Sequence, residues 1–530
     1  MRQTADTPVL VVGAGPVGAI LALELARHGV ACTVVERSSR PSIHPKMDYV
    51  NARSMELLRG LGLSTAVREA GVAPRHPTDF QWTQRLDGPP VMIWHHPSVD
   101  QMRREYAAVN DGTAPVEPYQ RVEGSQLERL ARDAARRHPL IDLREGWSVT
   151  DLAVDPDGVQ ATVAGPTTQG TVTARYLVGC DGGHSTVRRA LRIGLDRDGP
   201  VTSHCSVYFR SRDPALRRYG RAFLTIGAMG VNLVSRDEEH VWSASVLVPS
   251  DEPAPADPMA LVKERLGCEF TVDEVMSVAQ WEGSLAVANH YRRGGAFLAG
   301  DAAHQFYPAG GHGANTGIGD AMDLGWKLAA VVNGWGGPEL LTSYERERRP
   351  VALFNRELCA DLVAVSRRFS RLAQAGASRE QLAGILEQEA HQVDNIGVHF
   401  GHRYTTSPVI WAEDGDAPPW QWRQITATTW PGSRAPSTRL ASGAQLFDLF
   451  GVGFTLVDLS GRGTGEPLVK EAVRRGIPMT HLALADDAVR ACWERDLVLV
   501  RPDHVVAWRD DEPALDWDAV LDRVTGRETP

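Results

Sequence analysis

The sequence is poor in the features that mark several large protein classes. Its 530 residues include only 6 cysteines, and these form neither a C-x-x-C pair nor the spacing of a metal site. No apolar run approaches the roughly 20 residues of a membrane helix. The N-terminus lacks the apolar core and cleavage site of a signal peptide. We therefore expect a cytoplasmic protein with reduced thiols that binds no metal and enters no membrane.

Positive charge is not in excess either. The formal net charge is −10, which disfavours a partner such as nucleic acid or an anionic membrane. The chain shows no activated serine or cysteine and no Schiff-base lysine with a phosphate loop. Hydrophobic residues make up 43% of the sequence, enough to give two or three domains a core each.

What the chain does contain is a β-α-β pattern at its beginning. An apolar strand, 8–12, runs into the turn Gly13–Gly18 and the helix 19–28, and a second strand, 31–35, ends at Glu36. This G-x-G-x-x-G turn between two strands, with an acid after the second, predicts a dinucleotide site. Gly13 permits the tight turn, Gly15 admits a pyrophosphate, Gly18 allows the helix to pack closely, and Glu36 binds a ribose. The predicted contacts are Gly13, Gly15, Pro16, Val17, Gly18, Glu36 and Arg37.

The stretch 297–327 is the most informative part of the sequence. A short apolar strand, 296–299, ends at Gly300, Asp301 follows, and a glycine-rich turn leads into a helix expected to begin near Asn315. A carboxylate just beyond a strand accepts a hydrogen bond from a ligand hydroxyl. Glycines let the backbone approach a flat ligand, and a helix start attracts an anion. The pattern predicts a second contact region for a flat, anionic cofactor.

Written out, this stretch reads Gly-Asp-Ala-Ala-His from 300, Pro-Ala-Gly-Gly-His-Gly-Ala-Asn from 308, Asp-Ala at 320 and Trp-Lys at 326. It resembles the second flavin-binding motif of the single-component, FAD-dependent aromatic hydroxylases. The resemblance covers essentially the whole chain. It implies that Asp301 holds the ribityl chain and that 311–315 lies along the pyrimidine side of the flavin ring. The implied contacts are Gly300, Asp301, Pro308, Gly311, His312, Gly313, Ala314 and Asn315.

Three further stretches resemble the same family. Asp181 and Arg188 follow a strand in the pattern that the family uses to link FAD and NAD(P)H binding. Arg121 stands where the family has a flavin-contacting arginine, although the family's following glutamine is Gly124 here. Lys46 lies in a loop whose family equivalent covers the flavin. Plain surface charge for Lys46, and a simple β-α turn for 179–188, are the alternative interpretations.

The order of these patterns predicts an α/β fold. We expect a Rossmann-like FAD-binding domain from 1–75, 101–190 and 285–400. A substrate-binding domain built on an antiparallel sheet, from 76–100 and 191–284, would be inserted into it. Residues 401–530 resemble the thioredoxin-like C-terminal domain of the larger phenol and polyketide hydroxylases. Without a C-x-x-C pair we assign this domain to homo-oligomerisation or stability, not to redox chemistry.

The resemblance implies a monooxygenase that consumes NADPH or NADH, reacts its reduced FAD with O2 to a C4a-hydroperoxide and hydroxylates a small aromatic substrate, usually a phenol. We favour a bulky phenolic or quinone-like compound in polyketide-type, antibiotic biosynthesis. A catabolic chlorophenol hydroxylase, a Baeyer–Villiger monooxygenase, a flavin dehydrogenase and a non-enzymatic flavin-binding protein are the alternatives. Pro308 would lie at the reacting edge, with His312 and Tyr307 as candidate bases. Tyr208, Phe223 and Trp242 would line the substrate pocket.

Overall fold

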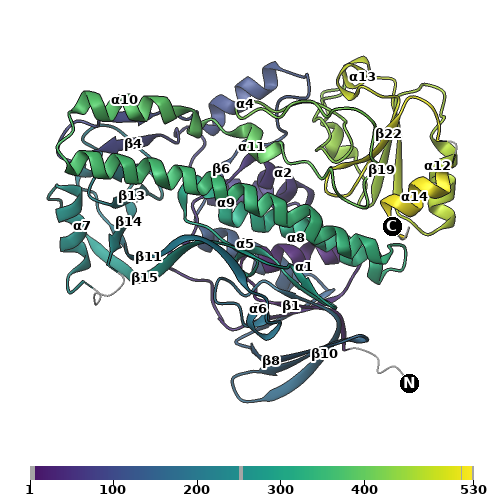
Figure 1. The fold of residues 1–530 in the computed structure, drawn as a ribbon, viewed down its shortest axis with the longest axis horizontal. Coiled ribbons are helices and arrows are strands. Elements are labelled where there is room, and N and C mark those ends of the chain that lie inside the picture. Colours follow the sequence, from purple (N-terminus) through teal and green to yellow (C-terminus); the bar gives the residue numbers. More distant parts are fainter. Residues whose placement is uncertain (1–5, 250–254, 515, 528–530) are drawn as a thin grey trace.

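Three larger β-sheets, a two-stranded one and one very long helix organise the described part of the molecule (Figure 1). The computed structural model describes residues 6–249, 255–514 and 516–527. In this part of the chain no helix is long and apolar enough to cross a membrane. The predicted α/β class, with an inserted antiparallel sheet and a thioredoxin-like C-terminal domain, is confirmed.

The first sheet has a parallel centre, in the order β16-β17-β10-β1-β2-β7. Its middle strand β1 is an unbroken apolar run whose residues 9–11 have no solvent exposure, as expected for a strand covered on both faces. The strands are β1 (Thr7–Val12), β2 (Cys32–Glu36), β7 (Ile141–Glu145), β10 (Gln169–Gly179), β16 (Arg292–Arg293) and β17 (Ala296–Leu298), with β8 (Ser148–Asp155) and β9 (Gly158–Ala164) paired beside β10.

Two helices pack closely because one of them, α8, carries glycine where they meet. α1 (Pro16–Arg27) lies against α8 (His312–Val332), and a Cβ added at Gly325 of α8 would lie 2.6 Å from Cγ of Glu24 in α1. α5 (Gly124–Arg137) also contacts α1. The smaller elements of this region are β3 (Tyr49–Val50), α2 (Ala52–Gly60), α3 (Ser64–Ala70), α4 (Val99–Ala108), β6 (Gln120–Arg121) and α6 (Thr186–Ala190).

The start of α8 differs from the expectation. The helix begins at His312, three residues before Asn315, and runs without a break through 326–332. Gly310 and Gly311 have φ angles of +76° and +66°, which residues other than glycine rarely adopt. These two left-handed glycines turn the chain directly into the helix.

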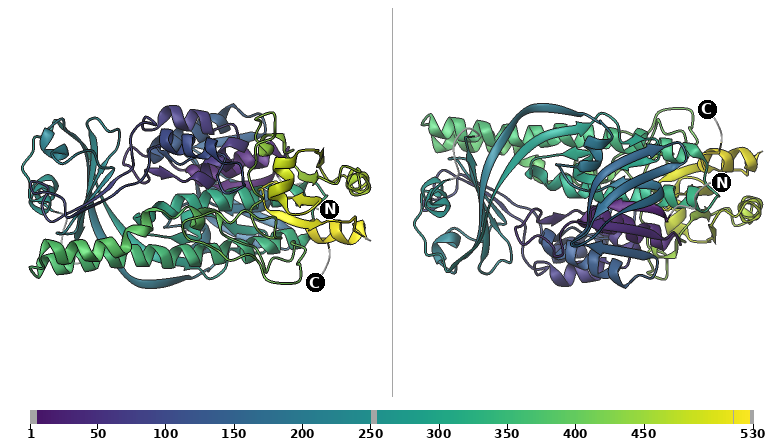
Figure 2. Two further views of the ribbon diagram at one scale, coloured as in Figure 1. Left: turned by 90° about the horizontal axis from the view of Figure 1, so that it is seen from above. Right: turned by 90° about the horizontal axis from the view of Figure 1, so that it is seen from below.

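The second sheet is carried on two long strands that leave the first sheet's domain (Figure 2). β11 (Leu195–Arg210) and β15 (Glu274–Ala288) pair antiparallel over nearly their whole lengths. The sheet order is β18-β15-β11-β14-β13-β12-β4-β5. The other members are β4 (Phe80–Thr83), β5 (Met92–Trp94), β12 (Leu224–Gly227), β13 (Val231–Ser235), β14 (Val241–Val248) and β18 (His304–Gln305), with α7 (Pro258–Leu266) packed on one face.

The C-terminal sheet has the order β20-β19-β21-β22, with one parallel and two antiparallel pairs, as in thioredoxin-like folds. Its core strand β19 is fully buried. The elements are β19 (Phe454–Asp458), α12 (Glu466–Arg474), β20 (Met479–Ala483), α13 (Asp487–Trp493), β21 (Leu497–Val500), β22 (Val506–Asp510) and α14 (Trp517–Val524).

The helix α9 (Pro338–Gln374) spans 37 residues and runs beside α8 toward the second sheet (Figure 1). α10 (Arg379–Glu389) turns back along it, followed by the short helix α11 (Ile396–Phe400). The strands of the first and second sheets come from alternating parts of the chain, as an inserted domain requires. The exact domain limits stay a prediction.

A fully buried ion network joins the C-terminal domain to α8 and α9. Arg501 binds Glu347 of α9 at 2.8 Å, Asp323 of α8 at 2.9 Å and Asp503 at 2.6 Å. Lys327 binds the same two acids of α8 and α9, at 2.8 and 2.6 Å. Although burial opposes it, the cations Arg501 and Lys327 hold the pKa of Glu347 below its usual range. One arginine of the third domain therefore neutralises carboxylates that lie in the first.

We expect Arg501→Met to destabilise the protein by about 3–5 kcal/mol, because it leaves three buried carboxylates with Lys327 as their remaining counter-charge. Urea unfolding, followed by circular dichroism, measures the change. Arg490→Met is the matched control, since Arg490 belongs to the same domain and its side chain is 43% exposed. A loss below about 1 kcal/mol for Arg501→Met would show that the network contributes little to holding the domains together.

Candidate functional site

The turn between β1 and α1 has the geometry of a pyrophosphate cradle. Gly13 has a φ of +101°, and an added Cβ would lie 2.5 Å from the carbonyl oxygen of Cys180. At Gly18 an added Cβ would lie 2.0 Å from the carbonyl oxygen of Gly13, so this glycine permits the close packing of helix and turn. At Gly15, by contrast, no atom of the described residues lies within 4 Å of an added Cβ. The open space at Gly15, at the N-terminus of α1, is where an anionic ligand fits.

Glu36 holds this turn in place from the end of β2. Its carboxylate accepts hydrogen bonds from the backbone N–H of Ala14 at 2.7 Å and of Ser38 at 2.8 Å. Arg132 lies 3.6 Å from the same carboxylate and donates to the Ala14 carbonyl at 2.8 Å. Glu36 thus braces the turn, and the neighbouring Arg37 is exposed. The ribose contact expected of Glu36 stays a prediction.

The second glycine motif lies directly against the first. A Cβ added at Gly300 would lie 3.0 Å from Val17, and one added at Gly317 of α8 would lie 2.6 Å from the same side chain. Residues almost 300 positions apart in sequence therefore form one continuous surface. The N-termini of α1 and α8 both belong to it, so the molecule brings together the two regions that the sequence predicts for one cofactor.

Buried hydrogen bonds fix the turn that carries Asp301 at the end of β17. The backbone N–H of Gly300 donates to Asp320 at 3.1 Å, and Asp320 in turn binds His304 and Arg348, each at 2.8 Å. The side chain of Asp301 is exposed, yet the surrounding protein raises its pKa, against the opposing charges of His304 and Lys46. A carboxylate that is open to a ligand can accept a hydrogen bond from a ligand hydroxyl.

Asn315 ties the start of α8 to the neighbouring strand β3. Its side-chain oxygen accepts from the backbone N–H of Asn51 at 2.9 Å, while its amide nitrogen donates to the carbonyls of Tyr49 and Gly311 at 3.0 and 2.7 Å. The carboxamide therefore shapes the turn instead of pointing freely at a ligand. Gly313 and Ala314 lie half-buried in the first turn of the helix, where backbone N–H groups remain available.

Asp181 and Arg188 also position the backbone. Asp181 accepts from the Ser185 hydroxyl at 2.5 Å and from the Thr186 N–H at 2.6 Å, and so caps α6. Arg188 donates to the carbonyls of Ala302 at 3.0 Å and Gly183 at 2.8 Å. The arginine thereby links the turn after β10 to the turn that carries Asp301. The cofactor contacts expected of both residues stay predictions.

Arg121 and the loop around Lys46 meet a hairpin of the second sheet. Arg121 is buried, and it pairs with Glu238 at 2.5 Å while its guanidinium stacks 4.4 Å from the ring of Phe223. Asp48, next to the exposed Lys46, forms an ion pair with Arg236 of the same hairpin. The hairpin thus clamps the loop that the sequence places over the flavin. The flavin contacts of Arg121 and Lys46 stay predictions.

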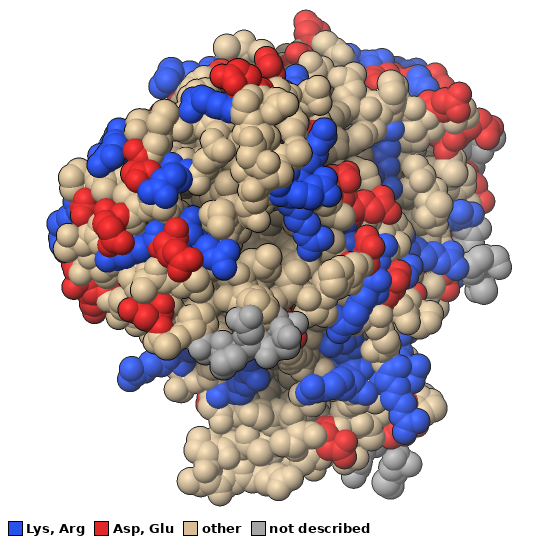
Figure 3. All heavy atoms as spheres, turned by 60° about the vertical axis from the view of Figure 1, so that its left-hand side comes forward, with Lys and Arg blue, Asp and Glu red and all other residues tan. Residues whose placement is uncertain are grey.

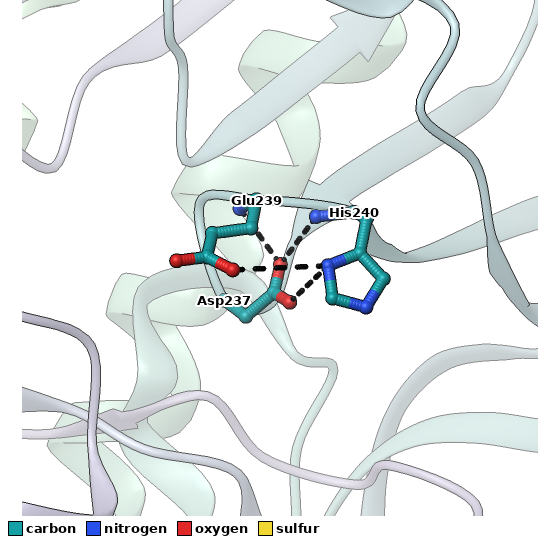
Figure 4. Close-up of side chains that lie close together, drawn as sticks. All are labelled: Asp237, Glu239 and His240. Carbon is teal, nitrogen blue, oxygen red and sulfur yellow. Dashed lines mark hydrogen bonds and ion pairs between the residues drawn. The ribbon is translucent and has the colours of Figure 1, made fainter.

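The same hairpin contains a group of potential metal ligands, Asp237, Glu239 and His240 (Figure 4). Asp237 accepts from the backbone N–H groups of Glu239 at 2.8 Å and His240 at 2.9 Å, and the His240 ring lies 3.3 Å from the same carboxylate. These hydrogen bonds show that the three residues cap a tight turn.

On the face shown in Figure 3, basic and acidic side chains are interspersed, and basic ones are densest beside a hollow near its middle.

The three aromatic residues expected in the substrate pocket occupy different environments. Tyr208 is half-buried and donates from its hydroxyl to Glu123 at 2.9 Å. Phe223 lies under Arg121. Trp242 is 3% exposed, packs in the core beneath α7, and donates to the Ser211 carbonyl at 3.1 Å. The substrate contacts expected of Tyr208, Phe223 and Trp242 stay predictions.

The candidate catalytic residues lie together at the turn before α8. Pro308 is exposed, whereas Tyr307 is buried and donates to the carbonyl of Pro200 at 3.0 Å. His312 is 4% exposed, and its Nε2 has no hydrogen-bond partner among the described residues. Burial lowers the pKa of His312 to about 4, so its ring is neutral at pH 7.

Beside this turn lies a cavity of about 320 Å³ that the sequence did not predict. One wall is His312, and the others come from α9, α10 and the segments that follow α10. We call it the α9–α10 chamber. Its lining residues are His312, Leu358, Asp361, Leu362, Ala364, Val365, Arg368, Ile385, Glu389, His391, Gln392, Asn395 and Trp422.

Known proteins resemble the chain along its whole length. Residues 6–355 match the family model described as "FAD binding domain", and residues 428–528 match "Aromatic-ring hydroxylase, C-terminal". The FAD-dependent monooxygenase apdD of Emericella nidulans is 34% identical over 95% of this chain and 87% of its own length. The tetracenomycin B2 monooxygenase-dioxygenase of Streptomyces olivaceus is 33% identical over 98% of both chains. The rebeccamycin biosynthetic enzyme RebC, solved with reduced flavin, superposes with a TM-score of 0.87 at 31% identity, covering 98% of this chain and 99% of its own.

Three histidines beside α8, of which His312 is buried and His399 and His402 are half-buried, predict acid sensitivity. Burial lowers the pKa of His399 and of His402 to about 3, in addition to that of His312. In the unfolded chain each ring takes up a proton near pH 6.5, whereas the folded state takes it up only near pH 3–4. Stability is therefore complete above pH 6.5 and falls as the pH drops, by about 2 kcal/mol per histidine at pH 5.

Urea unfolding at pH 7 and pH 5 measures this loss. His399→Gln should reduce the difference between the two pH values by about 2 kcal/mol. The exposed His184 provides the matched control, His184→Gln, which should leave the difference as it is in the parent protein. An unchanged difference in His399→Gln would contradict the prediction.

Proposed function

Because the chain belongs to the FAD-dependent aromatic-ring hydroxylases, we propose that it hydroxylates a bulky phenolic or quinone-like compound in secondary-metabolite biosynthesis. It is a monooxygenase with FAD as cofactor and NAD(P)H as electron donor. One observation carries the proposed site: Val17, Gly300 and Gly317 bring the two glycine motifs into direct contact, so that a single cofactor can span both. The names of the tetracenomycin and rebeccamycin enzymes support a biosynthetic substrate.

In this proposal each part of the surface has its own task. The open space at Gly15 and the N-terminus of α1 receive the pyrophosphate. Asp301 accepts a hydrogen bond from a hydroxyl of the ribityl chain. The first turn of α8, from His312 to Asn315, offers backbone N–H groups to the pyrimidine edge of the flavin. When bound, FAD would supply the acceptor for the hydride of NAD(P)H and the activation of O2 needed to insert one oxygen atom into the aromatic ring.

The protein's own residues bind, orient and exclude water. Glu36, Arg188 and Asp320 hold the turns around the cofactor through backbone hydrogen bonds. Pro308 is placed at the exposed edge of the turn. His312, whose ring is neutral and whose Nε2 has no hydrogen-bond partner in the described part of the chain, is the candidate for exchanging a proton there. Tyr307 is a poorer candidate because its hydroxyl already donates to Pro200.

Two further parts of the proposal concern the setting of the enzyme. All six cysteines are free, which supports a reducing, cytoplasmic location. The C-terminal domain, whose Val473 is 68% exposed, is the proposed surface for contact between copies. Basic side chains interspersed on the face of Figure 3 supply local attraction for the phosphates of NAD(P)H despite the net negative charge.

Gly15→Val tests the cofactor site without disturbing the fold. Because nothing lies within 4 Å of the added Cβ, the protein should fold normally and lose FAD. Flavin absorbance per protein after gel filtration measures the loss, and circular dichroism checks the fold. Gly170→Val is the matched control, since its Cβ also meets open space, at the far end of β10. Full FAD content in Gly15→Val would place the pyrophosphate elsewhere.

Oxygen stoichiometry tests the reaction. NAD(P)H and O2 consumption should rise together when a hydroxylated polycyclic compound is added, with one atom of ¹⁸O₂ entering the product. Mass spectrometry of the product detects the label. A rise in NAD(P)H oxidation by an added acceptor without O2 consumption would instead indicate a dehydrogenase.

A further inference from the structure

Arg348 of α9 is a buried arginine that joins α8 to the segment following α11. Its Nε donates to Asp320 of α8 at 2.8 Å, and its Nη2 donates to the backbone carbonyl of Thr316 in the same helix at 3.0 Å. Its Nη1 donates to the hydroxyl of Tyr404, beyond α11, at 2.9 Å. A guanidinium is planar and its N–H groups point in fixed directions, so these three acceptors together fix where it lies.

Asp320 connects this arginine to the turn that carries Asp301. Oδ1 of Asp320 accepts from Arg348, whereas Oδ2 accepts from the backbone N–H of Gly300 at 3.1 Å and lies 2.8 Å from Nε2 of His304. Each oxygen of the carboxylate therefore has its own partners, and Arg348 fixes how the carboxylate is rotated. Because Gly300 immediately precedes Asp301, a rotation of the Asp320 carboxylate changes where the exposed side chain of Asp301 lies.

Gly319 leaves the space that the guanidinium occupies. A Cβ added at Gly319 would lie 2.6 Å from Nη2 of Arg348, the nitrogen that donates to Thr316. Glycine is less favourable than alanine inside a helix, and Gly319 lies in the interior of α8. The helix thus carries an unfavourable residue at the one position where a methyl group would displace Arg348.

Tyr404 is held in turn by the C-terminal domain. The backbone N–H of Tyr404 donates to the carbonyl of Gly432 at 3.0 Å, and the N–H of Gly432 donates to the carbonyl of Val506 in β22 at 2.8 Å. Gly432 has a φ of +86°, and an added Cβ would lie 3.0 Å from the carbonyl carbon of Tyr404. The guanidinium of Arg501, from the same domain, lies 5.4 Å from the centre of the Tyr404 ring. The third sheet therefore determines where the Tyr404 hydroxyl lies.

We propose that the thioredoxin-like domain sets the affinity for FAD by placing the hydroxyl of Tyr404, which orients Arg348 and, through Asp320, the turn that carries Asp301. Tyr404 is thus a positioning residue that does not touch the cofactor. This inference rests on the proposed function in one respect, because it takes Asp301 to hold the ribityl chain. It gives the third domain a task in cofactor binding, in addition to contact between copies.

Tyr404→Phe removes the hydroxyl and keeps both the ring and the backbone hydrogen bond to Gly432. Dilution of the FAD-loaded, full-length enzyme, followed by separation of free from bound FAD, measures the dissociation constant. We expect this constant to rise at least about fivefold in Tyr404→Phe. Tyr219→Phe is the matched control, since it removes a hydroxyl that donates to the Asp87 carbonyl at 3.0 Å in the second domain, and it should leave the constant unchanged.

Gly319→Ala reaches the same arginine from the other side. The added methyl group displaces the guanidinium of Arg348, while alanine favours the helix. We expect FAD to bind at least about fivefold more weakly, although the helix itself is favoured. Gly384→Ala is the matched control, because Gly384 lies inside α10 and no atom of the described residues lies within 4 Å of its added Cβ. Parental affinity in Gly319→Ala would contradict the role of Arg348.

A double variant separates positioning from a general loss of structure. If Tyr404 acts through Asp301, Tyr404→Phe should weaken FAD binding by less than about twofold in an Asp301→Asn background. The same factor in both backgrounds, or parental affinity in Tyr404→Phe, overturns the proposal. A parent protein that binds FAD and inserts labelled oxygen, but whose Tyr404→Phe variant binds FAD normally, disproves the role of Tyr404 and leaves the proposed function intact. A parent protein that binds no FAD disproves the function itself.

Discussion

The contact of Val17 with Gly300 and Gly317 is the constraint on which the site depends. It requires glycine at two positions of the second motif, because any Cβ there would lie at or within 3.0 Å of Val17. The contact merges the turns after β1 and β17 into one surface, and the sheet beneath holds those strands on either side of β10. Two helix N-termini then face the same region, and their aligned N–H groups supply positive potential without any charged side chain.

Around this contact the charged residues act mainly on the backbone. Glu36 accepts a hydrogen bond from the backbone N–H of the first turn, and Asp320 accepts one from that of Gly300. Arg188 donates to the carbonyl of Ala302. Such residues look like ligand contacts in a motif because they are charged and follow strands. In the folded protein they fix the shape into which a ligand fits, while Asp301 alone among these acids presents an exposed carboxylate.

The parts of the site that could be predicted from sequence are those made within one short segment. The turn at Gly13–Gly18 and the turn at 300–315 are local, and Gly13, Gly18 and Gly300 each have a close contact that requires glycine. The sequence did not predict which side chains of the second sheet face the core and which face the other side. Trp242 pairs with Phe209 and so shares its core-facing side, whereas Tyr208 pairs with Ser243 on the other side. That distinction depends on the strand register, which the strand sequences alone do not specify. The chamber was not predicted because its walls come from segments with ordinary helical periodicity, brought together only by the return of α10 along α9.

Because α9 is long, it connects two distant parts of the molecule. Glu347, near one end, is anchored by Arg501 of the third domain, and 358–368, further along, form a wall of the chamber. Pro350 lies between these two parts and removes one hydrogen bond from the helix interior. The helix is thus held by an ion pair near one end and lacks one backbone hydrogen bond at Pro350. The thioredoxin-like domain and the wall of the chamber are therefore connected through one continuous helix, although they lie at different parts of the molecule.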